Sequence, residues 1–132
     1  MVPLLQETPR IPARVGIGAS AGKTVNIIIS GLKINTAKGE LDASPLAHKS
    51  GILNLTLAEN SANELIAGAF HAGLEKNDVN GAPDETFALN IDSQGDGADA
   101  GWGSLTAKSL YGTIGKSSYS AGIGGAAVYR RH

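Results

Sequence analysis

The chain has 132 residues, of which 42% are hydrophobic, 17% are charged and none is cysteine. This length and balance fit a single folded domain, 1–132, and exclude an intrinsically disordered chain. The lack of cysteine excludes disulfides, thiolate metal ligands and a cysteine nucleophile. No stretch approaches the roughly 20 apolar residues of a membrane helix. The first residues show no signal peptide, so we expect cytoplasmic synthesis and no membrane partner.

Charge is distributed unevenly, although the net charge is only −1. Residues 1–58 sum to +3, residues 59–99 to −8 and residues 100–132 to +4. A chain that is basic at both ends and acidic between them favours head-to-tail contacts, because opposite charges lie on different surfaces.

The N-terminal residues 1–14 contain Pro3, Pro9 and Pro12, which disfavour a helix or a central strand. We expect an extended arm here. It packs along its own domain in one interpretation and reaches a neighbouring subunit in the other.

The segment 16–24 (GIGASAGKT) resembles a phosphate-binding loop but has the wrong spacing. The first glycine of that motif would have to be residue 17, which is Ile. We therefore expect a turn and no nucleotide. Residues 24–35 follow with a strong strand pattern whose alternation shifts by one position at Gly31, which predicts a glycine bulge.

Residues 52–59 (ILNLTLAE) alternate apolar and polar side chains and predict a half-buried strand. For 61–76 two interpretations compete. Ser61 and Glu64 form a capping box before an apolar helical face, which favours a helix despite Gly68 and Gly73. The alternative is a strand that pairs back on residues 52–58.

Two alternating segments in residues 86–111 flank an acidic, glycine-rich loop, and we predict a β-hairpin there. The whole chain is then mainly β, an antiparallel β-sandwich or barrel with the extended arm and at most one helix, at about 61–76. We find no internal repeat at a solenoid period.

The loop at 92–103 holds Asp92, Asp96 and Asp99, and Trp102 lies at its end with Tyr111 beyond. Carboxylates on a glycine-rich backbone suit Ca²⁺, and an exposed aromatic beside them suits a sugar. The EF-hand pattern fails, however, since its twelfth position is Gly103. We favour a solvated hairpin tip with Trp102 buried in the core, and keep a ligand- or carbohydrate-binding domain, with or without Ca²⁺, as the alternative.

The remaining chemistry is sparse. His48, His71 and His132 have neither zinc-binding spacing nor a nucleophile in a recognisable motif. We expect no catalytic residues, no metal and no cofactor, and rank a small β-barrel enzyme last. The tail YRRH offers too little base and aromatic character for direct nucleic-acid binding.

These observations predict a non-enzymatic structural or self-assembling protein, of the virion coat, decoration or filament type. The expected partner is another copy of the chain, within an oligomer or a particle. We expect Asp92, Asp96 and Asp99 of one copy to meet basic residues of a neighbour. The basic candidates are Arg14, Arg130 and Arg131.

Overall fold

The structure is a computed structural model that describes residues 4–5, 14–37, 43–68, 70–77, 86–110 and 122–124. Every regular element in these residues is a β-strand, so the prediction of a mainly β chain is confirmed. The strands are β1 Leu4–Leu5, β2 Val15–Ile17, β3 Thr24–Ile29, β4 Lys33–Asn35, β5 Leu46–His48, β6 Ile52–Leu57, β7 Ala62–Ala67, β8 Leu74–Lys76, β9 Ala88–Ser93, β10 Ser104–Ser109 and β11 Ile123–Gly124. The described residues contain no helix that could span a membrane.

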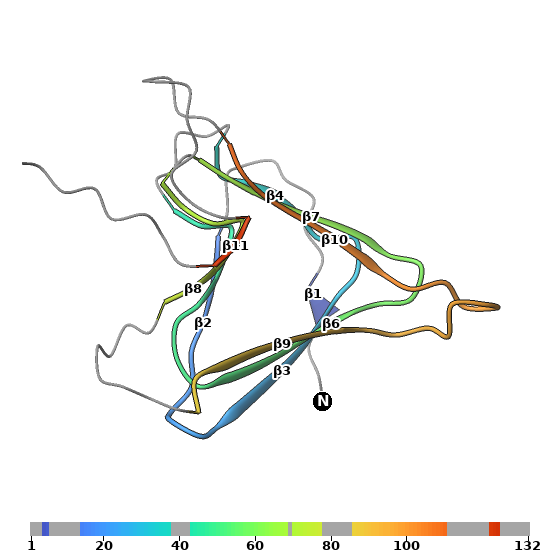
Figure 1. The fold of residues 1–132 in the computed structure, drawn as a ribbon, viewed down its shortest axis with the longest axis horizontal. Coiled ribbons are helices and arrows are strands. Elements are labelled where there is room, and N and C mark those ends of the chain that lie inside the picture. The colour runs from blue at the N-terminus through green and yellow to red at the C-terminus, as the bar shows by residue number, and fades with distance from the viewer. Residues whose placement is uncertain are drawn as a thin grey trace, which may run out of the picture.

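All strand pairs are parallel, and they form three sheets. Sheet A has the order β1-β3-β6-β9, sheet B the order β11-β8-β5-β2 and sheet C the order β10-β7-β4. The chain visits sheets B, A and C in turn, and each round is one coil. Figure 1 looks along the coil axis and shows the three sheets as the sides of a triangle. The fold is therefore a three-sided parallel β-solenoid.

The predicted antiparallel sandwich or barrel is wrong, and so is the hairpin at 86–111. β9 pairs in parallel with β6, whereas β10 pairs in parallel with β7 in a different sheet. The alternation of inward and outward side chains is the same in both kinds of sheet, so it did not reveal strand direction. The loop between β9 and β10 turns a corner of the triangle instead of reversing the chain.

The helix expected at 61–76 is also wrong. The segment contains β7 and β8, joined by a turn that includes Gly68 and Gly73. Inward burial of Leu65 and Ala67 follows a period of two, which overrides the capping box at Ser61. The alternative of a strand is correct, but β7 pairs with β4 and β10 and not with residues 52–58.

Of two other strand predictions, one is confirmed and one is wrong in part. β6 occupies the predicted strand at 52–59, with Leu53, Leu55 and Leu57 buried. The shift at Gly31 is real, but it marks a solenoid corner and not a bulge. Gly31 has φ +72° and separates β3 from β4, so the apolar side chains of both strands point inward.

The interior consists of side chains stacked in register from coil to coil. One such column in sheet A is Ile27, Leu55 and Ile91. The buried apolar residues of the core are Ile17, Ile27, Ile29, Leu32, Ile34, Leu46, Leu53, Leu55, Leu57, Leu65 and Leu74. Burial of these columns supplies the main stabilising free energy, at about 25 cal/mol per Å² of apolar surface.

The corners differ in length, which explains why no repeat was found in the sequence. Thr24 pairs with Ile52 and Ile52 with Ala88, so equivalent positions lie 28 and then 36 residues apart. The corner from sheet A to sheet C is short at 30–32 and at 58–61, but it spans 94–103 in the third coil. Such insertions leave the strand pairing intact and remove any fixed period.

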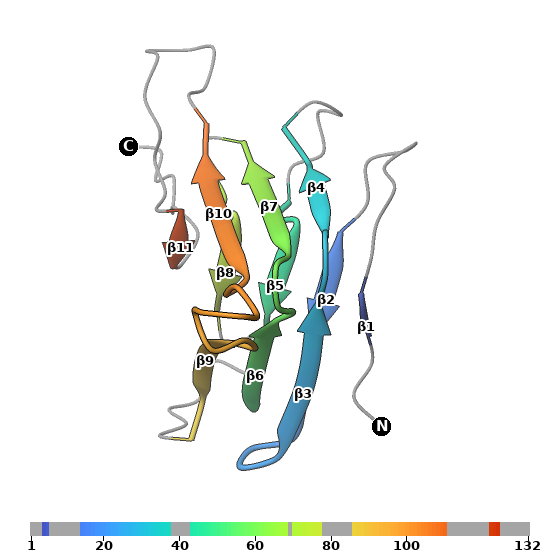
Figure 2. The ribbon, with the colours of Figure 1, turned by 90° about the vertical axis from the view of Figure 1, so that its right-hand side faces the viewer.

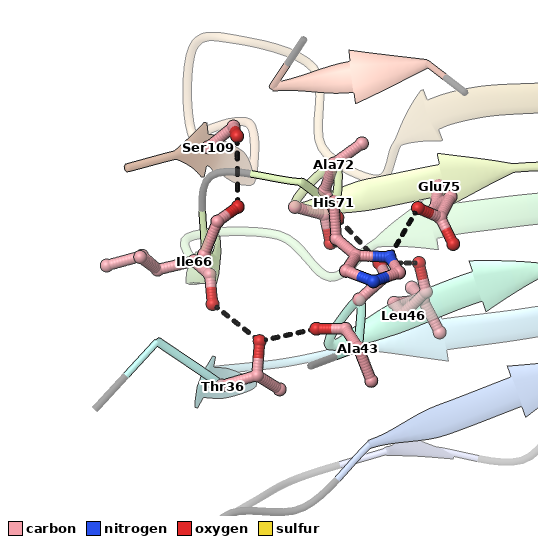
Figure 3. A network of polar contacts seen from close by, with 11 residues as sticks. Thr36, Ala43, Leu46, Ile66, His71, Ala72, Glu75 and Ser109 are labelled. Atoms are coloured by element: carbon pink, nitrogen blue, oxygen red, sulfur yellow. Dashed lines mark hydrogen bonds and ion pairs between the residues drawn. The ribbon is translucent and has the colours of Figure 1, made fainter. Parts of the chain in front are cut away.

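Polar side chains join neighbouring coils. At the corner between sheets C and B, the Ser44 hydroxyl donates to the carbonyl of Ala72 at 2.6 Å, and the Ser109 hydroxyl donates to that of Gly68 at 3.1 Å. Figure 3 shows this corner, where the Thr36 hydroxyl also donates to the Ala43 carbonyl. These hydroxyls satisfy backbone carbonyls at the corner, where the hydrogen-bond ladders of the sheets stop.

An asparagine ladder runs across the outer face of sheet A. The Asn54 amide donates to the side-chain oxygen of Asn26 at 2.9 Å, and the Asn90 amide donates to that of Asn54 at 3.0 Å. The three residues are in register on β3, β6 and β9. The ladder fixes the register of three coils from the outside, as the apolar columns do from the inside.

Of the expected N-terminal arm at 1–14, the structure describes only β1 and Arg14. β1 adds to the edge of sheet A by parallel pairing with β3. The remainder of the arm lies outside the described residues.

Candidate functional site at the open end of the solenoid

The C-terminal end of the solenoid is formed by β9, β10 and β11. β9 is the last strand of sheet A, and no described residue pairs with its outer edge. β11 is the last strand of sheet B and lies beyond β8. We call the surface formed by these strands the open end, and Figure 2 shows it on the side of β11, opposite β1.

Inward side chains lose their burial at the open end. In sheet A, Ile27 and Leu55 are 5% and 1% exposed, whereas Ile91 in the same column is 40% exposed. In sheet B, Leu74 is fully buried but its register partner Ile123 is 48% exposed. Both isoleucines belong to core columns, so the core is continued by apolar side chains that nothing in the described chain covers.

The outer edge of β9 also presents backbone donors. The N–H groups of Ala88 and Gln94 donate to carbonyls on the β6 side, those of Gly51 and Leu57. Successive residues of a strand direct their N–H groups to opposite sides. The N–H of Ile91 therefore points away from β6, toward the free edge. An edge of this kind is a template for another strand.

The opposite end carries the complementary charge. The first coil, residues 14–37, holds three basic side chains and no acidic one, those of Arg14, Lys23 and Lys33. The third coil, over residues 86–110, holds three aspartates and a single base, Lys108. The described molecule is thus positive at one end of its axis and negative at the other.

The loop 94–103 is built around Asp96. Its carboxylate accepts the backbone N–H groups of Ala98 at 2.8 Å and Ala100 at 3.1 Å. These two hydrogen bonds lower the pKa of Asp96 below its ordinary value, because they favour the charged form. Gly95 and Gly97 have φ of +104° and +78°, which explains the glycines of this loop. Asp96 thus organises the turn through its Oδ1 atom.

Trp102 lies on the surface of this loop. Its side chain is 66% exposed, so the expectation of a buried tryptophan is wrong. The ring packs over Gly97, where an added Cβ would lie only 3.1 Å from a ring carbon. The corner at 94–103 projects outward from the triangle, as Figure 1 shows.

The structure gathers some of the predicted site residues and separates others. Asp92, Asp96 and Asp99 lie together on β9 and its following loop, and all three are exposed. Arg14 lies in the first coil, before β2, and so at the other end of the axis. Tyr111, Arg130 and Arg131 lie outside the described residues.

Sequence reasoning missed the two residues that define the open end, Ile91 and Ile123. Their apolar character was visible, but only the coil order shows that they terminate buried columns. It also missed Lys33, which is exposed on the outermost described strand of sheet C at the first coil.

The described histidines serve the corners. His48 is fully buried with its Nε2 2.9 Å from the Gly51 carbonyl, and its ring lies 4.5 Å from that of Phe87. His71 Nδ1 contacts Glu75 Oε1 at 2.9 Å (Figure 3). Within the described ranges, no three histidine or carboxylate side chains are grouped to hold a metal ion.

Comparison with protein-family models, with curated proteins and with solved structures finds no match to this chain. The geometry alone therefore defines its class, a three-sided parallel β-solenoid.

Proposed function

We propose that this protein is a structural, self-assembling subunit of the filament or particle type, and not an enzyme. The observation that carries the proposal is the open end, where Ile91 and Ile123 leave core columns exposed. Repeat folds require a polar terminal cap for solubility as monomers. An apolar end that the described residues leave uncovered, beside a strand edge with which none of them pairs, favours association with another protein surface instead.

The charge layout supports the same function. A positive first coil and a negative third coil attract each other between copies, whereas like ends repel. The sequence hypothesis that Asp92, Asp96 and Asp99 meet basic residues of a neighbour is retained, with Lys23 and Lys33 added to Arg14 as candidate partners.

Substitution of Ile91 tests this proposal. We expect Ile91→Lys to abolish assembly, because the lysine places a charge in the contact, while the monomer stays folded because this position is already 40% exposed. Light scattering and sedimentation velocity across protein concentration measure the assembly, and circular dichroism the fold. Thr56→Lys, on the outer face of β6, is the matched control and should assemble normally. A wild-type chain that is monomeric at every concentration would contradict the proposal.

A second candidate function is ligand binding at the loop 94–103, favoured by the exposed ring of Trp102 in the same loop as Asp96 and Asp99. An aromatic platform next to carboxylates suits a sugar, since the ring stacks on apolar C–H groups and the carboxylates accept hydroxyl protons. Titration with a panel of oligosaccharides, measured by isothermal titration calorimetry, tests this function. Binding that survives Trp102→Ala would exclude it.

A further inference from the structure

We propose that copies of this chain stack head to tail and share one composite coil, in which β11 of one copy and β1 of the next copy occupy the same layer. This inference rests on the proposed assembly function and specifies its partner and its contact. In the stack, β1 of the next copy pairs with β9, and β11 pairs with β2 of the next copy.

The two ends are complementary in shape. Among the described strands, sheet A extends one strand beyond sheets B and C at the N-terminal end, because β1 precedes the first complete coil. At the C-terminal end, sheet B extends one described strand beyond the other two sheets, because β11 follows the third coil. Figure 2 shows β1 and β11 as the outermost strands on opposite sides. Each end is part of a coil, and the two parts lie on different sides of the triangle.

The register of the sheets continues across such a contact. Leu4 belongs to the column of Ile28, Thr56 and Asp92, so β1 of the next copy would set its Leu4 beside Asp92. In sheet B, Val15 and Ile123 belong to one column. Val15 of the next copy would then lie beside Ile123.

The backbone pattern agrees with this register. In a parallel pair, a residue whose backbone N–H and C=O point toward the neighbouring strand forms hydrogen bonds with the two residues on either side of its register partner. A strand that sets Leu4 opposite Asp92 therefore bonds to backbone groups of Ile91, which point away from β6 toward the outer edge of β9. No rearrangement of β9 is needed to receive it.

The composite coil also covers the exposed core. Val15 of the next copy would continue the column of Ile123, which then becomes interior as Leu74 already is. In sheet A, β1 of the next copy would place Leu4 and Leu5 beside Asp92 and Ser93, the residues that follow Ile91 on β9. The positive first coil of one copy would approach the negative third coil of the other. Two chains joined through their C-terminal ends would instead bring two negative third coils together. Their β11 strands would compete for the same layer, and their β9 edges would have to pair antiparallel.

The absence of native cysteine allows a directional test. Residues in register on adjacent strands lie about 4.8 Å apart, within the span that a disulfide bridges. We would prepare one chain with Val15→Cys and another with Ile123→Cys, and oxidise each alone and as a mixture. The expected result is a covalent dimer in the mixture only, together with a ladder of oligomers from the chain that carries both substitutions.

Three outcomes would overturn the inference, and they differ from one another. Crosslinking of pure Ile123→Cys would show contact between like ends. Assembly by light scattering without a mixed dimer would retain the proposed function and reject the composite coil. Chains that stay monomeric by light scattering and give no mixed dimer would reject both the proposed function and the composite coil.

Electron microscopy of the crosslinked stack provides an independent readout. Each copy contributes four layers, so an axial repeat of about 19 Å is expected from layers about 4.8 Å apart. A repeat longer by about one layer would exclude the shared coil, because the two ends would then occupy separate layers.

Discussion

At the scale of single residues, Gly73 occupies a position where the backbones of successive coils leave no room for a side chain. A Cβ on Gly73 would lie 2.4 Å from the Leu65 carbonyl oxygen and 2.8 Å from the Lys108 nitrogen. Gly68, five residues earlier in the same turn, has no atom within 4 Å of such a Cβ. The two glycines therefore have different roles.

We predict that Gly73→Ala lowers the free energy of unfolding by about 1–3 kcal/mol, because β7 and β10 must separate to admit the methyl group. Gly68→Ala is the matched control and should change it by less than about 0.5 kcal/mol. Urea denaturation followed by circular dichroism measures both. Equal effects of the two substitutions would refute the close approach at Gly73.

Asp96 gives a prediction on pH. Since hydrogen bonds from Ala98 and Ala100 lower its pKa below 3.8, its contribution to the order of the loop is present at neutral pH and is lost as pH falls through the lowered value. Carboxyl NMR should show Asp96 titrating below 3.8. The emission of Trp102 should change over the same pH range, and Asp96→Ala should produce that change at pH 7. Emission of the variant that matches the wild type would count against this role.

Inward and outward positions were largely predictable from the sequence, because the period of two is a local property. Leu53, Leu55 and Leu57 were correctly placed inside. Trp102 was not, since residue type alone favours burial and the projection of its corner depends on how β9 and β10 are placed in separate sheets. Exposure of Ile91 was equally hidden, because it depends on the number of coils.

At the scale of elements, the asparagine ladder ties together three strands that lie far apart in the chain. Asn54 takes part in both hydrogen bonds, whereas Asn90 takes part in one. Net values of about 0.5–1.5 kcal/mol are typical of one hydrogen bond, and partial exposure favours the lower end.

We therefore predict that Asn54→Ala lowers the free energy of unfolding by about 1–2 kcal/mol, roughly twice the effect of Asn90→Ala, since it removes two bonds. Thr56→Ala, also on the outer face of β6, is the control and should have a smaller effect. Chemical denaturation of the three variants gives the comparison, and an Asn90→Ala effect as large as that of Asn54→Ala would contradict the ladder.

Strand positions were easier to predict than strand partners. The segments of β3, β6, β9 and β10 all carried a visible pattern, but their pairing depends on contacts between coils. The corner at 94–103 is longer than the corner at 58–61, and this difference removed the period that would have indicated a solenoid. At 61–76 a local capping signal was stronger than the short strands that the tertiary contacts select.

At the scale of the whole molecule, charge varies along the solenoid axis, from the basic first coil to the acidic third coil. In a head-to-tail stack these ends meet, and salt screens attraction between exposed charges beyond roughly 10 Å at 0.1 M. We predict that raising NaCl from about 0.05 to 0.5 M weakens assembly several-fold. Sedimentation velocity measures this, and Lys33→Glu should weaken assembly at low salt. If assembly of both the wild type and Lys33→Glu strengthened with salt, the contact would be apolar alone and the charge argument would be wrong.

The strand ladders join residues that are 24 to 49 positions apart in the chain. Long stretches of chain must come together before any strand pair forms, so folding is expected to be slow for a chain of this length. Once one coil exists, each further coil needs only to add to a ready edge. The open end of a folded copy is such an edge, and preformed stacks should therefore act as seeds that shorten the lag before new chains assemble.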